Sequence, residues 1–112
     1  EQEVAEAQLR WALEHAELPE MAHTVRLRLV RVLIDAGKLD QAGQLLGDTG
    51  RAGAYQYLYE ELRGDMSLAA GDAAAATSAY KAAIDAMPAD APNAAFLSAK
   101  YEDVAGADGA VK

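Results

Sequence analysis

Apolar residues recur at helical spacing over most of this chain, in stretches separated by proline or glycine. In residues 1–18 they include Leu9 and Leu13, with glutamates placed between them to face water. Pro19 ends this stretch. Because proline is tolerated in the first turn of a helix, a second helix is expected to begin at once and to run to Ala36. The pattern therefore predicts two successive helices in the first third of the chain.

The segment RLRLVRVLI, residues 26–34, is ambiguous by itself. Its alternation and its β-branched residues would also suit a strand. We predict a helix, because Pro19 and Gly37 lie one helix length apart and because the shift that places Gly37 on Gly71 superposes this region on part of residues 57–70.

The rest of the chain continues as helices separated by turn residues. Glycines at 47, 50 and 53 indicate a loop, Gly71 is suited to the left-handed conformation that ends a helix, and Asp72 can cap the next one. Helices are expected over residues 39–46, 54–70, 72–87 and 93–105, with a turn at 88–92 and a disordered tail at 106–112.

A repeat with the length of a tetratricopeptide unit underlies this order. Gly71, Ala76, Tyr80, Ala83 and Pro88 have the spacing of such a unit: a turn glycine, a small residue, an aromatic residue, a second small residue and a proline stop. The small residues would allow the two helices of a pair to approach closely, and a single pair cannot bury its apolar face alone.

Shifts by one repeat find the same kinds of residue elsewhere. Shifting back from Gly71 gives Gly37, Ala42 and Leu46, and shifting forward from Gly64 and Ser67 gives Ser98 and Tyr101. We therefore predict an all-α, tetratricopeptide-like α-solenoid of about six antiparallel helices over residues 1–105. It would contain two helix pairs and a half-repeat at each end.

Composition limits the kinds of partner. The chain of 112 residues has a formal net charge of −8, which would repel a phosphate backbone, so nucleic acid is not expected as a partner. No cysteine is present for a disulfide or a thiolate metal site, and no apolar run is long enough to span a bilayer. Because the chain opens on Glu1 already in a helical pattern, we expect it to be part of a longer protein.

No motif in the sequence indicates catalysis or a cofactor. The glycines at 47, 50 and 53 match neither a dinucleotide fingerprint nor a P-loop. Glu20 and His23 have the spacing of one half of a di-iron site, but no second half is present. His15 and His23 flank Pro19 and are interpreted as ordinary surface histidines. We predict a protein that is not an enzyme and that binds no metal or cofactor.

Two groups of side chains allow either a structural or a binding interpretation. Arg26, Arg28 and Arg31 are interpreted as a solvated face that pairs with neighbours such as Asp35, with an anchor for an acidic partner as the alternative. The tyrosines at 55, 57 and 59 are interpreted as core residues, with a partner-binding aromatic as the alternative.

The first helices of successive tetratricopeptide pairs line a concave groove that holds a peptide or a partner helix. Counting from Gly37 and Gly71, we expect the groove to present both apolar and charged side chains. The lysine and asparagine clamp for a C-terminal carboxylate is absent from the matching positions. The predicted partner groove consists of Thr24, Leu27, Arg31, Asp35, Leu58, Glu61, Asp65, Leu68, Ala95 and Ala99.

Three segments carry a more specific resemblance. They are LRLVRVLIDAGKLDQAGQLL, LYEELRGDMSLAAGDAAAATSAYKAAI and FLSAKYEDVA, and the run ELRGD-x-x-L-A-x-GD is the most specific part. Over roughly residues 21–105 the chain resembles the C-terminal region of the YfgM-type ancillary subunits of the bacterial Sec translocon. The resemblance implies an inner-membrane protein with an N-terminal membrane anchor outside this sequence and a periplasmic tetratricopeptide-like domain.

The same resemblance implies protein partners, namely the SecYEG translocon and a PpiD-like periplasmic chaperone, and it supplies no catalytic residues. The function expected is a non-enzymatic protein-interaction scaffold that links the translocon to periplasmic chaperones. Two alternatives are a general tetratricopeptide adaptor and a self-associating structural domain. In the latter, a homodimer would form through the apolar residues of the first helix, Val4, Leu9, Trp11 and Leu13.

Overall fold

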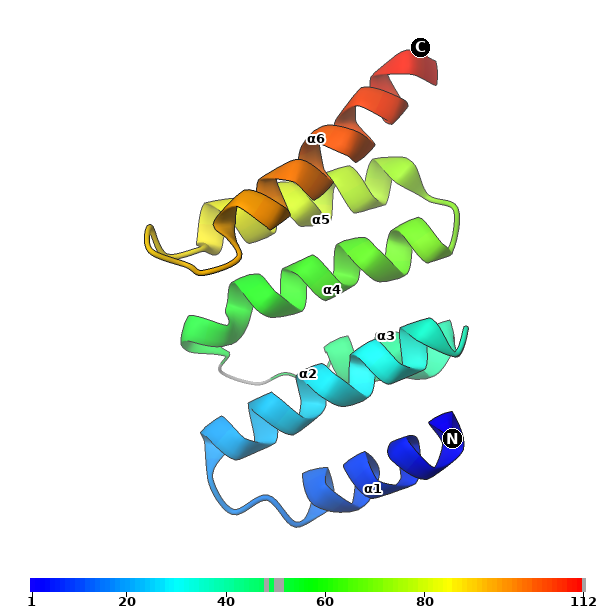
Figure 1. The fold of residues 1–112 in the computed structure, drawn as a ribbon, viewed down its shortest axis with the longest axis vertical. Coiled ribbons are helices and arrows are strands. Elements are labelled where there is room, and N and C mark those ends of the chain that lie inside the picture. Colours follow the sequence, from blue (N-terminus) through cyan, green and yellow to red (C-terminus); the bar gives the residue numbers. More distant parts are fainter. Residues whose placement is uncertain (48, 50–51, 112) are drawn as a thin grey trace. The chain divides into compact units, whose positions relative to one another are not determined.

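The computed structural model describes residues 1–47, 49 and 52–111 and consists of helices joined by short turns (Figure 1). No strand occurs among these residues, so the predicted all-α class is confirmed. The α-helices are α1 (Gln2–Glu14), α2 (Pro19–Asp35), α3 (Leu39–Gly47), α4 (Gln56–Ala69), α5 (Ala73–Ala86) and α6 (Ala94–Val111), and a 3₁₀ turn, η1 (Gly53–Tyr55), precedes α4.

The ambiguous segment at residues 26–34 is helical and lies within α2. Pro19 occupies the first turn of α2, after an extended Leu18, as the sequence predicted. The buried residues of α2 are Leu29, Val30, Leu33 and Ile34. Their spacing places them on one face of a helix, whereas a strand would divide neighbouring pairs between opposite faces. Burial of this stripe therefore favours the helix over the local strand propensity.

Gly37 and Gly71 end α2 and α4 in the same way. Both have positive φ, 77° and 83°. After α2, the Gly37 N–H donates to the Ile34 carbonyl at 3.0 Å, and the following N–H, that of Lys38, donates to Leu33 at 2.8 Å. This is a Schellman motif. The Gly71 and Asp72 N–H groups make the equivalent bonds to Leu68 and Ser67, at 3.0 and 2.9 Å. The repeat found in the sequence is thus visible in the backbone.

Replacing Gly71 with alanine should destabilise the fold by about 1 kcal/mol, because a residue with a Cβ is strained in the left-handed conformation. A Cβ at this position would meet no neighbouring atom within 4 Å, so the cost comes from the backbone alone. Denaturant unfolding followed by circular dichroism measures the loss. Ala70→Gly, one residue earlier at a φ of −81°, serves as the control for added backbone freedom. A Gly71→Ala protein as stable as the wild type would contradict the role of the positive φ.

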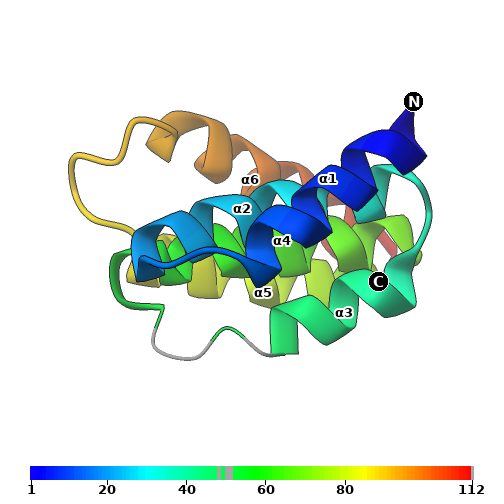
Figure 2. The same ribbon diagram turned by 90° about the horizontal axis from the view of Figure 1, so that it is seen from below.

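The chain divides into two compact units, Glu1–Ala52 and Gly53–Lys112. In the first unit, α2 packs against both α1 and α3 (Figure 1, Figure 2). Ala42 and Leu46 of α3 are fully buried, as is Leu33 of α2. The small residue at 42 allows close packing, as the repeat pattern predicted.

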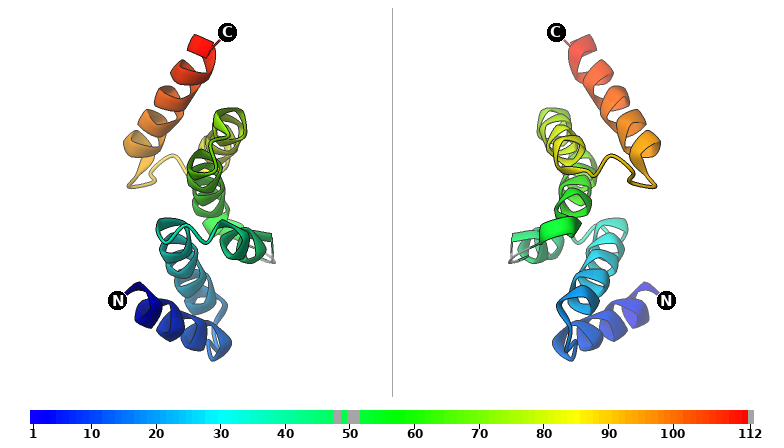
Figure 3. Two further views of the ribbon diagram at one scale, coloured as in Figure 1. Left: turned by 90° about the vertical axis from the view of Figure 1, so that its right-hand side faces the viewer. Right: turned by 90° about the vertical axis from the view of Figure 1, so that its left-hand side faces the viewer.

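In the second unit, α5 packs against α4 and against α6, which lies beside the α4–α5 hairpin in Figure 3. The side chain of Asp72 caps α5 by accepting from the Ala75 N–H at 3.0 Å, as expected. Five buried residues form the core of this unit: Ala76, Tyr80, Ala83, Leu97 and Val104.

Gly64 of α4 faces the Tyr80 ring directly. A Cβ built at Gly64 would lie 2.9 Å from Cζ of Tyr80, and closer still to two other ring carbons. The ring and the glycine therefore occupy complementary space within one helix pair, and Tyr80 also contributes to the packing of α6 through the core that it shares with Leu97.

Two parts of the predicted organisation, the loop after α3 and the C-terminal tail, include residues that the structure does not describe. The predicted loop between Gly47 and Gly53 includes residues 48, 50 and 51, which lie outside the described residues. Helix α6 reaches Val111 and so continues past the end expected at 105. The single domain over residues 1–105 and the disordered tail at 106–112 stay predictions, and residue 112 is not described.

Candidate protein-binding surface

The groove residues predicted on α2 make some contacts within the fold, but several of their side chains are partly exposed. The Thr24 hydroxyl donates to the Glu20 carbonyl at 2.9 Å, and Leu27 is half-buried. Arg31 lies 3.9 Å from the Asp35 carboxylate, and both side chains are about half exposed. This pairing agrees with the solvated-face interpretation of the arginines. Arg26 instead reaches the Leu45 carbonyl of α3, at 3.4 Å.

A second polar group in the first unit ties α1 to the turn between α2 and α3. Lys38 Nζ lies 2.6 Å from Oε1 of Glu6, and Arg10 Nε donates to the other carboxylate oxygen at 3.1 Å. The Arg10 guanidinium also donates to Gln41. The hydrogen bond from Lys38, followed by that from Arg10, lowers the pKa of Glu6 below its ordinary value.

The lowered pKa of Glu6 makes a prediction about acid stability. Because the folded state holds the carboxylate in its charged form, this contribution is fully present above the ordinary glutamate pKa. It is lost as the pH falls through the lowered folded-state value. The stability difference between the wild type and Glu6→Gln should therefore shrink on acidification, which denaturant unfolding at a series of pH values measures. A difference that stays constant with pH would contradict the ionic role.

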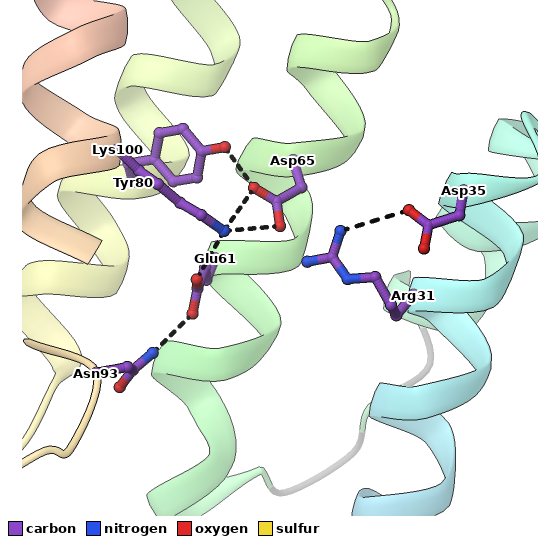
Figure 4. Close-up of polar contacts among 7 residues, drawn as sticks. All are labelled: Arg31, Asp35, Glu61, Asp65, Tyr80, Asn93 and Lys100. Atoms are coloured by element: carbon purple, nitrogen blue, oxygen red, sulfur yellow. Dashed lines mark hydrogen bonds and ion pairs between the residues drawn. The ribbon is translucent and has the colours of Figure 1, made fainter. Parts of the chain in front are cut away.

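In the second unit, side chains from α4, α5 and α6 converge on one polar group, the Lys100 cluster (Figure 4). Lys100 Nζ lies 2.8 Å from Oε2 of Glu61 and 3.1 Å from both carboxylate oxygens of Asp65. Asn93 donates to the other oxygen of Glu61 at 3.0 Å, and the Tyr80 hydroxyl donates to Asp65. The Lys100 cluster consists of Glu61, Asp65, Tyr80, Asn93 and Lys100.

The Lys100 cluster is largely shielded from water. The exposed fractions of the Glu61, Asp65 and Lys100 side chains are 10%, 11% and 20%. Every buried side-chain polar atom in the described part of the chain has a hydrogen-bond partner. With two carboxylates and one ammonium group, the cluster has a formal charge of −1. The cluster joins α6 to α4, and its net negative charge would attract a cationic group on a partner.

Two exposed apolar side chains lie near members of the Lys100 cluster, one on α4 and one on α6. Leu68 follows Asp65 by three residues on α4, which places the two side chains on one face, and it is 48% exposed. Phe96 of α6 is 62% exposed, and Lys100 Nζ lies 4.8 Å from the centroid of its ring.

The other groove residues predicted in this unit are divided between exposed and covered positions. Ala95 and Ala99 lie on α6, where both are exposed, and Leu58 is half-buried on α4. Glu61 and Asp65, which were expected to face a partner, are instead held by Lys100. The groove as a binding site stays a prediction.

Sequence reasoning missed Asn93, Phe96 and Lys100. The only available signal was that Lys100 is the single basic residue of α6. Lys100 lies on α6, one repeat after α4, the helix that carries Glu61 and Asp65. An ion pair between these two helices could therefore have been predicted.

The remaining candidate chemistry finds structural explanations. Tyr59 is fully buried and Tyr57 packs against the core of α5 and α6, as the core interpretation of the tyrosines predicted. The His15 ring stacks on Trp11 with a centroid distance of 4.2 Å. The described residues contain no cluster of three potential metal-ligating side chains, and none of their helices is long and apolar enough to cross a membrane.

Comparison with known families decides the classification. The family model described as a tetratricopeptide repeat-like domain matches residues 1–106. The chain belongs to this family. No curated protein and no solved structure matched the chain. Tetratricopeptide repeat-like domains are typically modules for protein interaction rather than catalysts, so protein partners are the general expectation for this domain.

Proposed function

We propose that this tetratricopeptide repeat-like domain is a protein-interaction scaffold whose binding surface lies over the Lys100 cluster. The observation that carries the proposal is the placement of two exposed apolar side chains, Leu68 and Phe96, beside a shielded cluster with a negative balance. Exposed apolar side chains around a polar feature are typical of sites for protein partners.

The chemistry of the surface indicates what kind of segment it would hold. Leu68 and Phe96 would supply the apolar contacts, and most of the binding free energy would come from covering them. The Lys100 cluster would favour a basic residue on the partner and would set its register rather than its affinity. An extended peptide or an amphipathic helix with apolar residues on either side of a lysine or arginine fits this description.

We further propose that the domain acts on the periplasmic side of the bacterial inner membrane, as part of an ancillary subunit of the Sec translocon. The support is the resemblance of residues 21–105 to the YfgM-type subunits, above all in the run ELRGD-x-x-L-A-x-GD at the centre of the α4–α5 pair. SecYEG and a PpiD-like periplasmic chaperone are the partners proposed on this basis. A cytosolic adaptor of the same family is the alternative.

Site-specific photo-crosslinking tests this proposal. A photo-reactive residue placed at Leu68 or Phe96 in the full-length protein should capture a translocon component, a periplasmic chaperone or an emerging secretory chain. Lys81 is the control position, because it is more than half exposed and pairs with Asp85 on its own helix. Glu61 is unsuitable for the probe, since its replacement would disturb the Lys100 cluster.

The expected difference is at least severalfold more captured partner at Leu68 and Phe96 than at Lys81. Changing both Leu68 and Phe96 to serine should reduce capture by a probe at a neighbouring position by about tenfold, as expected for the loss of two apolar anchors. Equal capture at Lys81 would overturn the binding surface. Capture of cytosolic proteins alone would overturn the periplasmic assignment and leave the interaction surface intact.

A further inference from the structure

The Lys100 cluster places a primary amine directly against a carboxyl carbon. Lys100 Nζ lies 3.1 Å from each of the two carboxylate oxygens of Asp65. A nitrogen that is equidistant from both oxygens lies in the plane that bisects the carboxylate, and this plane contains Cγ. With ordinary bond lengths, Nζ is then about 3.5 Å or less from Cγ, which is a separation from which positioned groups can react.

Glu61 places a proton acceptor beside the same nitrogen. Glu61 and Asp65 lie four residues apart on α4 and therefore on one face of the helix. Oε2 of Glu61 is 2.8 Å from Lys100 Nζ. Asn93 donates to Oε1 at 3.0 Å, which fixes the carboxylate with its other oxygen toward the amine. Glu61 thus lies within the hydrogen-bond reach that a general base requires.

The surroundings of Asp65 and Lys100 favour a reaction between them. The Tyr80 hydroxyl donates to Oδ1 of Asp65, where it would stabilise negative charge that develops on this oxygen. The Phe96 ring covers part of the amine, with its centroid 4.8 Å from Nζ. The side chains of Glu61, Asp65 and Lys100 are each at most one-fifth exposed, so bulk water has limited access to the reacting atoms.

We propose that Lys100 and Asp65 form an intramolecular isopeptide bond, in which Nζ becomes bonded to Cγ and one water molecule is released. The ammonium group first gives a proton to Glu61, and the amine nitrogen then attacks Cγ. A second proton of the nitrogen and the proton held by Glu61 both pass to Oδ2, which leaves as water. Oδ1 remains as the amide oxygen. Glu61 ends as a carboxylate, and the reaction consumes no oxidant, reductant or cofactor.

The bond would join α6 covalently to α4. Asp65 and Lys100 are 35 residues apart in the sequence, so the link would close a loop that contains all of α5. Each molecule would react once with itself, which is a self-modification and involves no turnover of a substrate. The ion pair in the structure is the precursor of the bond, so chains that still have their full mass report on the ion pair alone.

Intact-mass spectrometry tests the proposal on the purified, folded chain at neutral pH. A species lighter by one water molecule should accumulate with time, at a rate that does not depend on protein concentration. Trypsin cleaves after arginine and lysine, so an unlinked chain gives the peptide 64–81 separately from the peptide that ends at Lys100. In the linked chain these two regions should remain joined, and cleavage at Lys100 should be lost.

Two variants and an unfolded control separate this chemistry from an unrelated loss of water. Glu61→Gln should form the bond at least about a hundredfold more slowly, as expected for the loss of a general base. Lys100→Arg keeps the positive charge beside both carboxylates, but its guanidinium stays protonated and should give no lighter species. Wild-type chain unfolded in urea should also keep its full mass. Circular dichroism verifies that both variants are folded.

Three results would overturn the proposal. They are a folded wild-type chain that keeps its full mass after prolonged incubation, a loss of water that leaves the two tryptic regions separate, and equal rates in the wild type and Glu61→Gln. None of them bears on the proposed binding surface, because neither Leu68 nor Phe96 takes part in the bond. Conversely, a failure of photo-crosslinking at Leu68 and Phe96 would leave the mass of the chain unchanged.

Discussion

Replacing Lys100 with methionine should destabilise the second unit by about 3 kcal/mol, the lower end of the cost of breaking a buried ion pair from one side. The change keeps most of the apolar stem and removes the ammonium group that faces Glu61 and Asp65. Two carboxylates that are each about one-tenth exposed would then repel one another without a counter-charge. Because Lys100 is partly exposed, we expect the loss of stability to lie at the lower end of that range.

Denaturant unfolding followed by helical circular dichroism measures this loss. Lys81→Met is the matched control, because it removes an exposed pair with Asp85 on a single helix and should have little effect on stability. Adding Glu61→Gln and Asp65→Asn to Lys100→Met should recover much of the stability, since the uncompensated charge is then gone. Equal losses for the two lysine variants would show that the Lys100 cluster contributes no more than a surface pair.

Replacing Gly64 with alanine should cost about 2 kcal/mol, although alanine is the better helix former by about 1 kcal/mol. The added methyl group would fall within the space of the Tyr80 ring, which is almost fully buried and has little room to move. Either the ring or one of the two helices must shift. That shift would also disturb the Tyr80 hydroxyl, which donates to Asp65.

Gly47→Ala is the control for the change in helix propensity, because a Cβ at Gly47 would meet no atom within 4 Å. It should leave the melting temperature unchanged or raise it slightly. Tyr80→Leu should cost less in the Gly64→Ala background than in the wild type, since the smaller side chain relieves the overlap. Stabilisation by Gly64→Ala would contradict the close approach of α4 and α5.

The surface around the Lys100 cluster has two separable roles. The cluster holds α6 beside α4, whereas Leu68 and Phe96 are exposed and contribute little to that packing. Variants of the two apolar residues should therefore alter binding with little effect on stability, and Lys100→Met should alter both. Comparing stability and crosslinking for the same set of variants separates folding from recognition.

Much of the local structure could be predicted because it depends on neighbouring residues. Pro19 fixes the start of α2, and Gly37 and Gly71 permit the left-handed residues that end α2 and α4. Ala76 and Tyr80 could be assigned to the core because their spacing repeats along the chain. The propensity of residues 26–34 was indecisive, since their β-branched side chains fit either structure until one face is buried.

By itself the sequence determined the helical class, the tetratricopeptide-length repeat and the positions where most helices begin and end, because those depend on backbone preferences and periodicity within a few turns. Only the tertiary structure decided that Glu61 and Asp65 are held by Lys100, which is far from both in the sequence, and that Phe96 and Trp11 are exposed. Ion pairs between helices and the exposure of single side chains depend on how helix faces meet. A pattern of residue types leaves that choice open.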